Sequence, residues 1–192
     1  TRLCQVFRKS ILVKRMSMNK KKIILLGADI LLLAVLIFLD QLTKHFAVVY
    51  LKDQMPISII DGVFELNYLE NRGAAFGMLQ DQKLFFIFIA VVILAVIVYV
   101  LIKTPNQRKY TKLHIALVCI AGGAIGNMID RLKLDYVVDF LYFSLINFPI
   151  FNVADIYVTL SAIYLVILLL FVYKESDLEF LSFRTKKFRD VK

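Results

Sequence analysis

The chain has 192 residues, of which 60% are hydrophobic, and a formal net charge of +9. This apolar fraction exceeds that of an average soluble domain, and the mean hydropathy is +0.74. Two cysteines, Cys4 and Cys119, are too few for a disulfide framework. The composition therefore excludes a disulfide-stapled secreted domain and favours an integral membrane protein.

Four apolar segments have the length that crosses a bilayer, which is roughly 20 residues. They cover about residues 23–43, 84–102, 113–129 and 153–173. We expect one membrane domain over residues 18–173, because four spans leave little chain for another domain. Residues 1–17 start without a Met and are expected to be disordered or foreign to the natural chain, and residues 174–192 form a basic tail.

The basic residues alternate between the two ends of the predicted spans. Residues 1–22 contain eight Lys or Arg, the 103–113 connection contains four, and the tail from Lys174 contains six. The other two connections, 45–83 and 131–151, contain few. This pattern predicts both termini in the cytoplasm and those two connections outside. The charge thus indicates topology and contact with anionic lipid, and it argues against nucleic-acid binding.

The first predicted span carries two acidic residues. Asp29 lies about a turn and a half beyond Lys22, so an acid tolerated near the cytoplasmic interface is the simplest interpretation. Asp40 opens a polar stretch at the outer end that finishes at Lys44. For Asp40, a solvated helix terminus and a functional role are both open.

The connection after the first span predicts a small sheet on the membrane. Residues 57–60 and 63–69 have strand-like patterns, and Asp61-Gly62 between them is a turn signal. The following run from Asn71 to Gly77 is rich in Gly and Ala. Taken alone, it indicates only a turn with small residues.

The third predicted span contains small residues near its outer end. Gly122 and Gly126 are one turn apart and would let another helix approach closely. Asp130 follows near the helix C-terminus, where a carboxylate opposes the helix dipole. We expect Asp130 to form a structural ion pair with the adjacent Arg131.

Two further acids flank the start of the last span. Asp139 stands among apolar residues, and such a setting raises a carboxyl pKa by desolvation. The aromatic-rich run from Phe140 to Phe151 is expected in the membrane interface. Asp155 follows Asn152 by three residues, so helix capping alone would explain both.

The topology nevertheless brings these polar residues to one outer face, which no packing rule requires. They are Asp40, Asn71, Arg72, Asn127, Asp130, Arg131, Asp139, Asn152 and Asp155. Two carboxylates from different segments that meet near water can share one proton. One would then take a proton from an attacking water while its protonated partner polarises a peptide carbonyl. This pattern favours a protease that uses a pair of acids.

Other chemistries fit the sequence less well. The only histidines are His45 and His114, with no HExxH motif or Cys/His cluster, so no metal or cofactor is expected. No G-x-S-x-G elbow or phosphate-binding glycine loop is present. An ion-coupled transporter and a non-catalytic scaffold are the alternatives, although a transporter would need acids through the depth of the membrane.

Five blocks of the sequence together resemble one family. They are Asp40–Lys44 (DQLTK), Asn71–Gly77 (NRGAAFG), Gly126–Arg131 (GNMIDR), Val137–Phe140 (VVDF) and Phe151–Asp155 (FNVAD). In order and spacing these blocks are similar to lipoprotein signal peptidase, the bacterial signal peptidase II, an intramembrane aspartyl protease family. The resemblance covers roughly residues 18–173.

The resemblance implies an all-α membrane fold, a four-helix bundle with a small extracytoplasmic sheet and a short interfacial helix in the 50–83 segment. It implies that Asp139 and Asp155 are the catalytic pair. It also implies site-shaping or substrate-binding roles for Asp40, Lys44, Asn71, Arg72, Gly73, Asn127, Asp130, Arg131 and Asn152. The implied substrate is a prolipoprotein cut just before a diacylglyceryl-modified cysteine, by a monomer in the bacterial cytoplasmic membrane with its active site at the outer face. Asp135 stands where the family often has Gly, which affects only the local turn.

Overall fold

The computed structural model describes residues 2–73 and 82–182, with side chains from Lys20 onward. It contains four long helices that are apolar enough to cross a membrane. They are α1 (Arg2–Leu51), α2 (Lys83–Lys103), α3 (Thr111–Leu134) and α4 (Val153–Ile167), the last continued by a π-helical turn at Leu168–Val172. The predicted fold, a four-helix membrane bundle with a small sheet, is confirmed.

Helices α1 and α3 extend beyond the predicted spans. The sequence after residue 43 is less apolar but contains no Gly or Pro before Pro56, so nothing stops the helix until Leu51. Towards the N-terminus α1 includes residues 2–17, which were expected to be disordered or foreign to the natural chain. Helix α3 ends only at Asp135, whose φ of 68° is left-handed. Glycine is the usual residue in that conformation, which explains why the resemblance pointed to Gly there.

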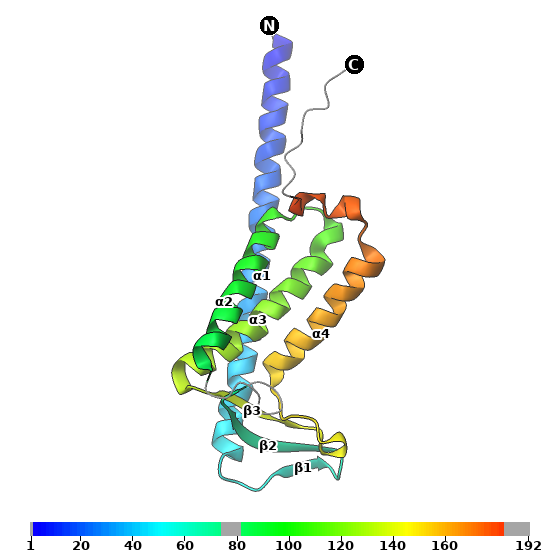
Figure 1. The fold of residues 1–192 in the computed structure, drawn as a ribbon. Helices are drawn as coiled ribbons and strands as arrows, with labels where there is room; N and C mark the ends of the chain where they lie inside the picture. Colours follow the sequence, from blue (N-terminus) through cyan, green and yellow to red (C-terminus); the bar gives the residue numbers. More distant parts are fainter. Residues whose placement is uncertain (1, 74–81, 183–192) are drawn as a thin grey trace.

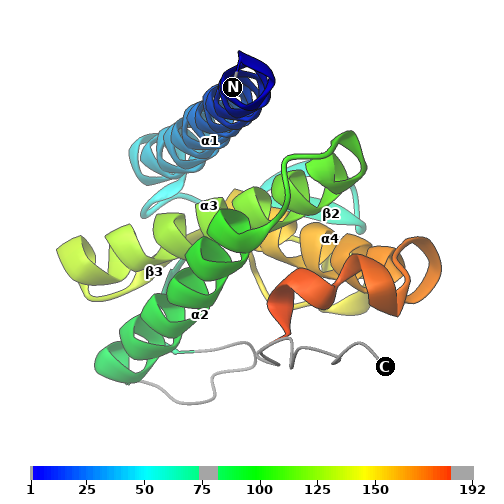
Figure 2. The ribbon, with the colours of Figure 1, turned by 90° about the horizontal axis from the view of Figure 1, so that it is seen from above.

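Helix α3 is the centre of the bundle and packs against the other three helices (Figures 1 and 2). Its glycines allow this close packing. A Cβ at Gly122 would touch Leu36 of α1, and a Cβ at Gly123 would collide with the backbone of Ala154 in α4. By contrast, Ile97 is the one buried residue of α2, which therefore presents most of its surface to lipid. The predicted role of the glycines in helix packing is confirmed.

A three-stranded antiparallel sheet lies at one end of the bundle (Figure 1). Its strands, in spatial order, are β1 (Ile57–Ile60), β2 (Phe64–Asn71) and β3 (Val137–Tyr142). The first two were predicted, including the turn, where Gly62 has a φ of 68°. Strand β3 was missed, because a short apolar run holding one acid does not by itself indicate a strand.

Strand pairing and packing fix the sheet to the bundle. Leu69 of β2 lies opposite Asp139 of β3, and Asn71 lies opposite Val137. Buried side chains of the sheet, among them Val138, pack against the last turns of α1 near Ala47. We call this end of the bundle the sheet end.

The opposite end, where α2 finishes, α3 starts and the described chain stops, is called the terminal end, and α1 projects beyond it (Figure 1). Here Lys174–Ser182 folds back in two short 3-10 turns. Tyr110 stacks on Tyr173, with ring centroids 5.8 Å apart, and Phe180 contacts Tyr110 edge-on. The described start of the predicted basic tail is thus packed on the bundle. The predicted interfacial helix is not found in residues 52–73, and residues 74–81 lie outside the described part of the chain.

Candidate active site

The first turn of α4 is closed by a reciprocal cap. The side chain of Asn152 accepts a hydrogen bond from the backbone N–H of Asp155 (3.0 Å), and the backbone N–H of Asn152 donates to Asp155 Oδ2 (3.1 Å). The predicted capping role is therefore confirmed. Capping occupies only one oxygen of Asp155, because Oδ1 accepts a hydrogen bond from Asn127 Nδ2 of α3 (2.8 Å).

Asp139 reaches the same place from β3, and 1% of its surface is exposed. Two amides hold its carboxylate. Asn71 Nδ2 donates to Oδ2 (2.7 Å), and Asn152 Nδ2 donates to Oδ1 (2.6 Å). Burial, and then the nearby charge of Asp155, raise the pKa of Asp139 to about 7, although the two amides oppose this rise. Asp139 can therefore carry a proton at neutral pH.

Asn152 links the two carboxylates. It donates to Asp139 from Nδ2 and forms the reciprocal cap with Asp155. Asn127 supports both, because its Oδ1 accepts from Asn152 Nδ2 (3.1 Å) and its Nδ2 donates to Asp155. The structure thus brings together the two acids that the resemblance singled out.

Lys44 is the buried cation beneath this pair, with 3% of its surface exposed. Its ammonium lies 2.9 Å from Asp40 Oδ2, 2.9 Å from Asp130 Oδ2 and 2.8 Å from Asn127 Oδ1. An ammonium group has three N–H donors, so all three are used. Lys44 of α1 therefore connects α1 to α3 through Asp130 and Asn127, and it neutralises charge on Asp40 and Asp130.

The predicted ion pair between Asp130 and Arg131 is wrong. Asp130 pairs instead with Lys44, and it also accepts hydrogen bonds from Gln41 Nε2 (2.8 Å) and the backbone N–H of Val138 (3.2 Å). The reason is geometric, since consecutive residues on a helix point in different directions. Gln41, which the sequence analysis treated only as part of a polar stretch, is a structural part of the site.

Arg131 supports the chain that follows β2. Its Nη2 donates to the carbonyl of Gly73 (3.3 Å), and its guanidinium lies 4.6 Å from the ring centre of Phe86. The backbone N–H of Gly73 in turn donates to Asn71 Oδ1 (3.0 Å), which orients the amide that holds Asp139. Arg72 lies at the rim, 52% exposed and 3.8 Å from Glu70.

Asp40 joins α1 to the start of α4. It is fully buried, and its Oδ1 accepts a hydrogen bond from the backbone N–H of Ala154 (3.1 Å). A Cβ at Gly126 would collide with the Asp40 carboxylate, so the glycine makes room for it. Asp40 is therefore a buried helix-to-helix contact, not a solvated helix terminus.

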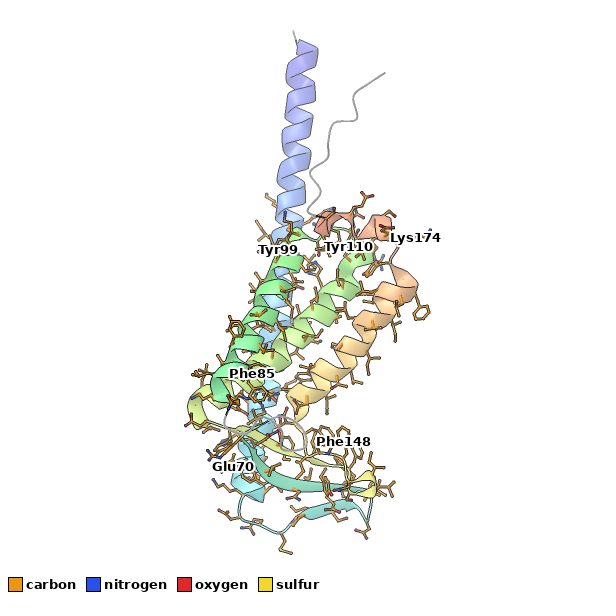
Figure 3. All side chains as sticks on the ribbon, viewed as in Figure 1. Glu70, Phe85, Tyr99, Tyr110, Phe148 and Lys174 are labelled. Carbon is orange, nitrogen blue, oxygen red and sulfur yellow. The ribbon has the colours of Figure 1, made fainter. Side chains whose placement is uncertain are left out.

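An open cavity of about 1060 Å³ lies over Asp139 and Asp155. Arg131, Asn71 and Gly73 contribute polar groups to it. Its remaining lining includes Leu69, Tyr142, Phe148, Pro149, Ile150, Phe151, Ile156, Thr159 and Leu160. The outer sheet and the run from Phe140 to Phe151 were expected to hold the acylated cysteine, whereas Ile156, Thr159 and Leu160 were not assigned to a site. Figure 3 shows two lining residues, Glu70 and Phe148, at the sheet end, with Tyr110 and Lys174 at the opposite end. Across the described side chains, no three His, Cys, Asp or Glu residues are grouped as metal ligands.

The fold and the site together define an integral membrane protein with a carboxylate-lined cavity at one end of a helix bundle. A family model described as signal peptidase (SPase) II matches residues 32–171. The chain belongs to the signal peptidase II family and is a membrane protease, as the sequence blocks predicted.

Similar proteins agree with this assignment. The chain is 48% identical to a lipoprotein signal peptidase of Caldanaerobacter subterraneus subsp. tengcongensis over 74% of its length and 95% of that protein. It is 43% identical to a lipoprotein signal peptidase of Streptococcus pyogenes serotype M5 over 77% of its length and 94% of that protein. A solved structure titled as a bacterial membrane enzyme, at 2.3 Å resolution, matches with a TM-score of 0.68 and 31% identity, over 86% of this chain and 95% of that one.

Proposed function

We propose that this protein is an aspartic endopeptidase that removes signal peptides from prolipoproteins, cutting just before a diacylglyceryl-modified cysteine. Asp139 and Asp155 are its catalytic pair. One observation carries the proposal: two carboxylates from separate segments line one cavity and are joined through Asn152. The names of the similar proteins support the substrate class.

The geometry supports a division of labour between the two acids. Asp139 holds the shared proton, because burial and the charge of Asp155 raise its pKa to about 7. Water attacks the scissile carbonyl carbon while Asp155 accepts a proton from that water, and Asp139 gives its proton to the carbonyl oxygen. When the tetrahedral intermediate collapses, the C–N bond breaks. Asp155 returns its proton to the leaving amine, and Asp139 recovers one from the hydroxyl.

The cavity suits a substrate that is partly lipid. Polar side chains, including Asn71 and Arg131, line it together with the acids, and apolar side chains such as Phe148, Phe151 and Leu160 form much of the remaining wall. Such walls can bury acyl chains and an apolar signal helix, while the carboxylates remain close to water. Because the basic residues gather at the terminal end, we place that end in the cytoplasm and the sheet end outside a bacterial cytoplasmic membrane. We further propose that the protein acts as a monomer that contacts membrane lipid and binds no nucleic acid.

The test is cleavage of a purified precursor by the purified enzyme in lipid nanodiscs. A diacylglyceryl-modified precursor and its unmodified form are compared, with release of the signal peptide as the readout. We expect only the modified form to be cut efficiently. Asp139→Asn and Asp155→Asn should lower kcat by about a thousandfold or more while both variants stay folded.

Asp177→Asn, which changes a carboxylate at the terminal end, is the matched control and should cleave normally. Turnover close to that of the wild type by either active-site variant would overturn the assignment of the pair. Efficient cleavage of the unmodified precursor would overturn the substrate class. A non-catalytic scaffold or a transporter would release no peptide from either form.

A further inference from the structure

A second buried acid–base contact lies far from the cavity and has no part in the proposed reaction. Asp29 Oδ2, in the middle of α1, is 2.6 Å from His114 Nδ1, in the first turn of α3. Asp29 is 9% exposed and His114 is 1% exposed. Burying polar side chains is costly even when they are paired, and two apolar residues would pack here at no such cost. We therefore asked what the contact between Asp29 and His114 contributes.

The position of Asp29 on its helix suggests what this contact contributes. Lys22, Asp29, Asp40 and Lys44 are separated by 7, 11 and 4 residues, each close to a whole number of helical turns. These four residues therefore form one polar stripe along α1. The stripe runs from the terminal end to the site.

Each member of the stripe binds a different part of the bundle. Lys22 Nζ donates to the carbonyls of Leu101 and Thr104, where α2 ends. Asp29 meets α3 at His114, and Asp40 meets α4 at the backbone N–H of Ala154. Helix α1 is thus tied to all three of its neighbours through directional contacts on a single face.

Between Asp29 and Asp40 the contact between α1 and α3 is apolar and close. A Cβ on Gly122 would come within 3.0 Å of Leu36 Cβ, so the helices nearly touch there. In lipid, apolar packing holds helices together but only weakly fixes their position along the helix axis. Hydrogen bonds are directional and can fix that position. The two polar ties from α1 to α3 are Asp29 with His114 and Lys44 with Asp130. They lie about 22 Å apart along α1 at 1.5 Å rise per residue, and together they would fix how far α1 can slide along α3.

We propose that Asp29 and His114 are positioning residues that set the axial register of α1 on α3. The register matters because Asp40 binds the residue immediately before Asp155, so a shift of α1 would move the first turn of α4. The inference rests on the catalytic role proposed for Asp155. The pair acts through Asp40 and touches no substrate.

The first test separates positioning from substrate binding. Asp29→Leu and His114→Leu remove the contact with side chains that suit a membrane interior. We expect kcat per folded enzyme to fall about tenfold to a hundredfold, the size of effect that a small misplacement of reacting groups can have. KM should stay nearly constant, because the described cavity lining comes from β2, β3, α3, α4 and their connections and includes no residue of α1.

Conservative variants of His114 sharpen the test. Asn places an amide N–H near the position of Nδ1, whereas Gln places it near Nε2, which has no partner among the described residues. We expect His114→Asn to keep kcat within about twofold of the wild type and His114→Gln to resemble the leucine variant. The Asn and Gln variants are both polar and similar in size. They therefore test the inference even if the leucine variants cannot be produced as folded protein. Equal kcat in the Asn and Gln variants would overturn the inference.

The second test reads the register without using activity. The double variant Leu36→Cys/Gly122→Cys, in a background of Cys4→Ser and Cys119→Ala, reports whether the two helices keep their alignment. A disulfide needs Cβ atoms about 4 Å apart, and these two positions approach closely enough to form one. We expect efficient oxidative cross-linking in the parent and several-fold slower cross-linking when Asp29→Leu is added. If Asp155→Asn were active, the proposed function would be wrong. The cross-linking measurement would still report whether Asp29 and His114 set the register of α1 on α3.

The control is Lys109→Gln, which breaks a salt bridge to Asp177 at the same end without touching α1. It should alter neither kcat nor cross-linking. Unchanged kcat per folded molecule together with unchanged cross-linking in both leucine variants would overturn the inference. Loss of folded protein alone, with normal kcat in the remainder, would also contradict it, because that is the result expected of a purely structural contact.

Discussion

The two ends of the bundle are held together by different physical means. At the sheet end, Lys44 is 3% exposed and binds Asp40 and Asp130, which are themselves buried. At the terminal end, Lys109 pairs with Asp177 at 2.7 Å, but the lysine side chain is 44% exposed. Apart from the contact between Asp29 and His114, most of the buried contact at the terminal end is apolar and aromatic packing around Tyr110.

The difference shows where the protein accepts an energetic cost. Burying ions is unfavourable unless each finds its full set of partners, and apolar packing could often replace such a network. The terminal end relies mainly on apolar packing, with the contact between Asp29 and His114 as the exception. The sheet end keeps its charges because Lys44 and Asp40 orient Asn127 and the start of α4, which hold the proposed catalytic acids.

The largest effect is expected from breaking the buried network. Lys44→Met leaves Asp40 and Asp130 without their cation, and removal of one partner from a buried ion pair costs about 3–5 kcal/mol. We expect the variant to unfold at much lower temperature in detergent than the wild type and to lose activity. Its control is Lys52→Met, which breaks the half-exposed contact with Glu70 at the same end and should melt normally.

Wild-type stability in Lys44→Met would show that the buried charges at the sheet end are not coupled in the way the distances indicate. Because the chain contains no Trp, its thermal unfolding is best monitored by circular dichroism and not by tryptophan fluorescence.

A smaller effect is expected from crowding the same network. Gly126→Ala places a methyl group against the Asp40 carboxylate. Overpacking of this kind costs about 1–3 kcal/mol, and we expect activity to fall because Asp40 must move away from Ala154. Gly27→Ala is the control in α1, where an added Cβ meets nothing within 4 Å. Equal melting temperatures and rates for the two variants would contradict the close approach.

The third prediction concerns the pH profile of cleavage. With the pKa of Asp139 raised to about 7, the rate should fall as the pH rises above that value and the pair loses its shared proton. Asn71 donates to Asp139 and stabilises its charged form, so Asn71→Ala should raise the pKa of Asp139 further. The basic limb of kcat/KM should then move to higher pH. Asn67→Ala, on the same strand and in the same cavity, should leave the limb in place, and a shift to lower pH in Asn71→Ala would contradict the sign.

How much of this could be predicted from the sequence depends on what each property requires. The four spans follow from local hydropathy, and the pair of strands β1 and β2 follows from alternation and a Gly turn. The cap formed by Asn152 and Asp155 also depends only on local spacing. These features were predicted because each is encoded within a few neighbouring residues.

Contacts between distant segments were not predicted to the same degree. The partner of Asp130 is Lys44, which is far away in sequence, and helix geometry alone excludes the adjacent arginine. His114 was noted only as one of two histidines, although the 11-residue interval between Asp29 and Asp40 already placed both acids on one face of a helix. That interval is the signal that could have directed attention to Asp29.

The smallest effect is expected at the terminal end. Lys109→Gln removes an ion pair that water already screens, and such exposed pairs contribute little to stability. Cleavage should be unchanged and the melting temperature nearly so. Tyr110→Ala should lower the melting temperature clearly, because a ring that is 3% exposed and packs on Tyr173 and Phe180 would leave a cavity, but it should not change kcat/KM. If Lys109→Gln lowered the melting temperature as much as Lys44→Met, burial would not explain the different contributions of the two ion pairs to stability. Both lysines would then contribute through their charge alone.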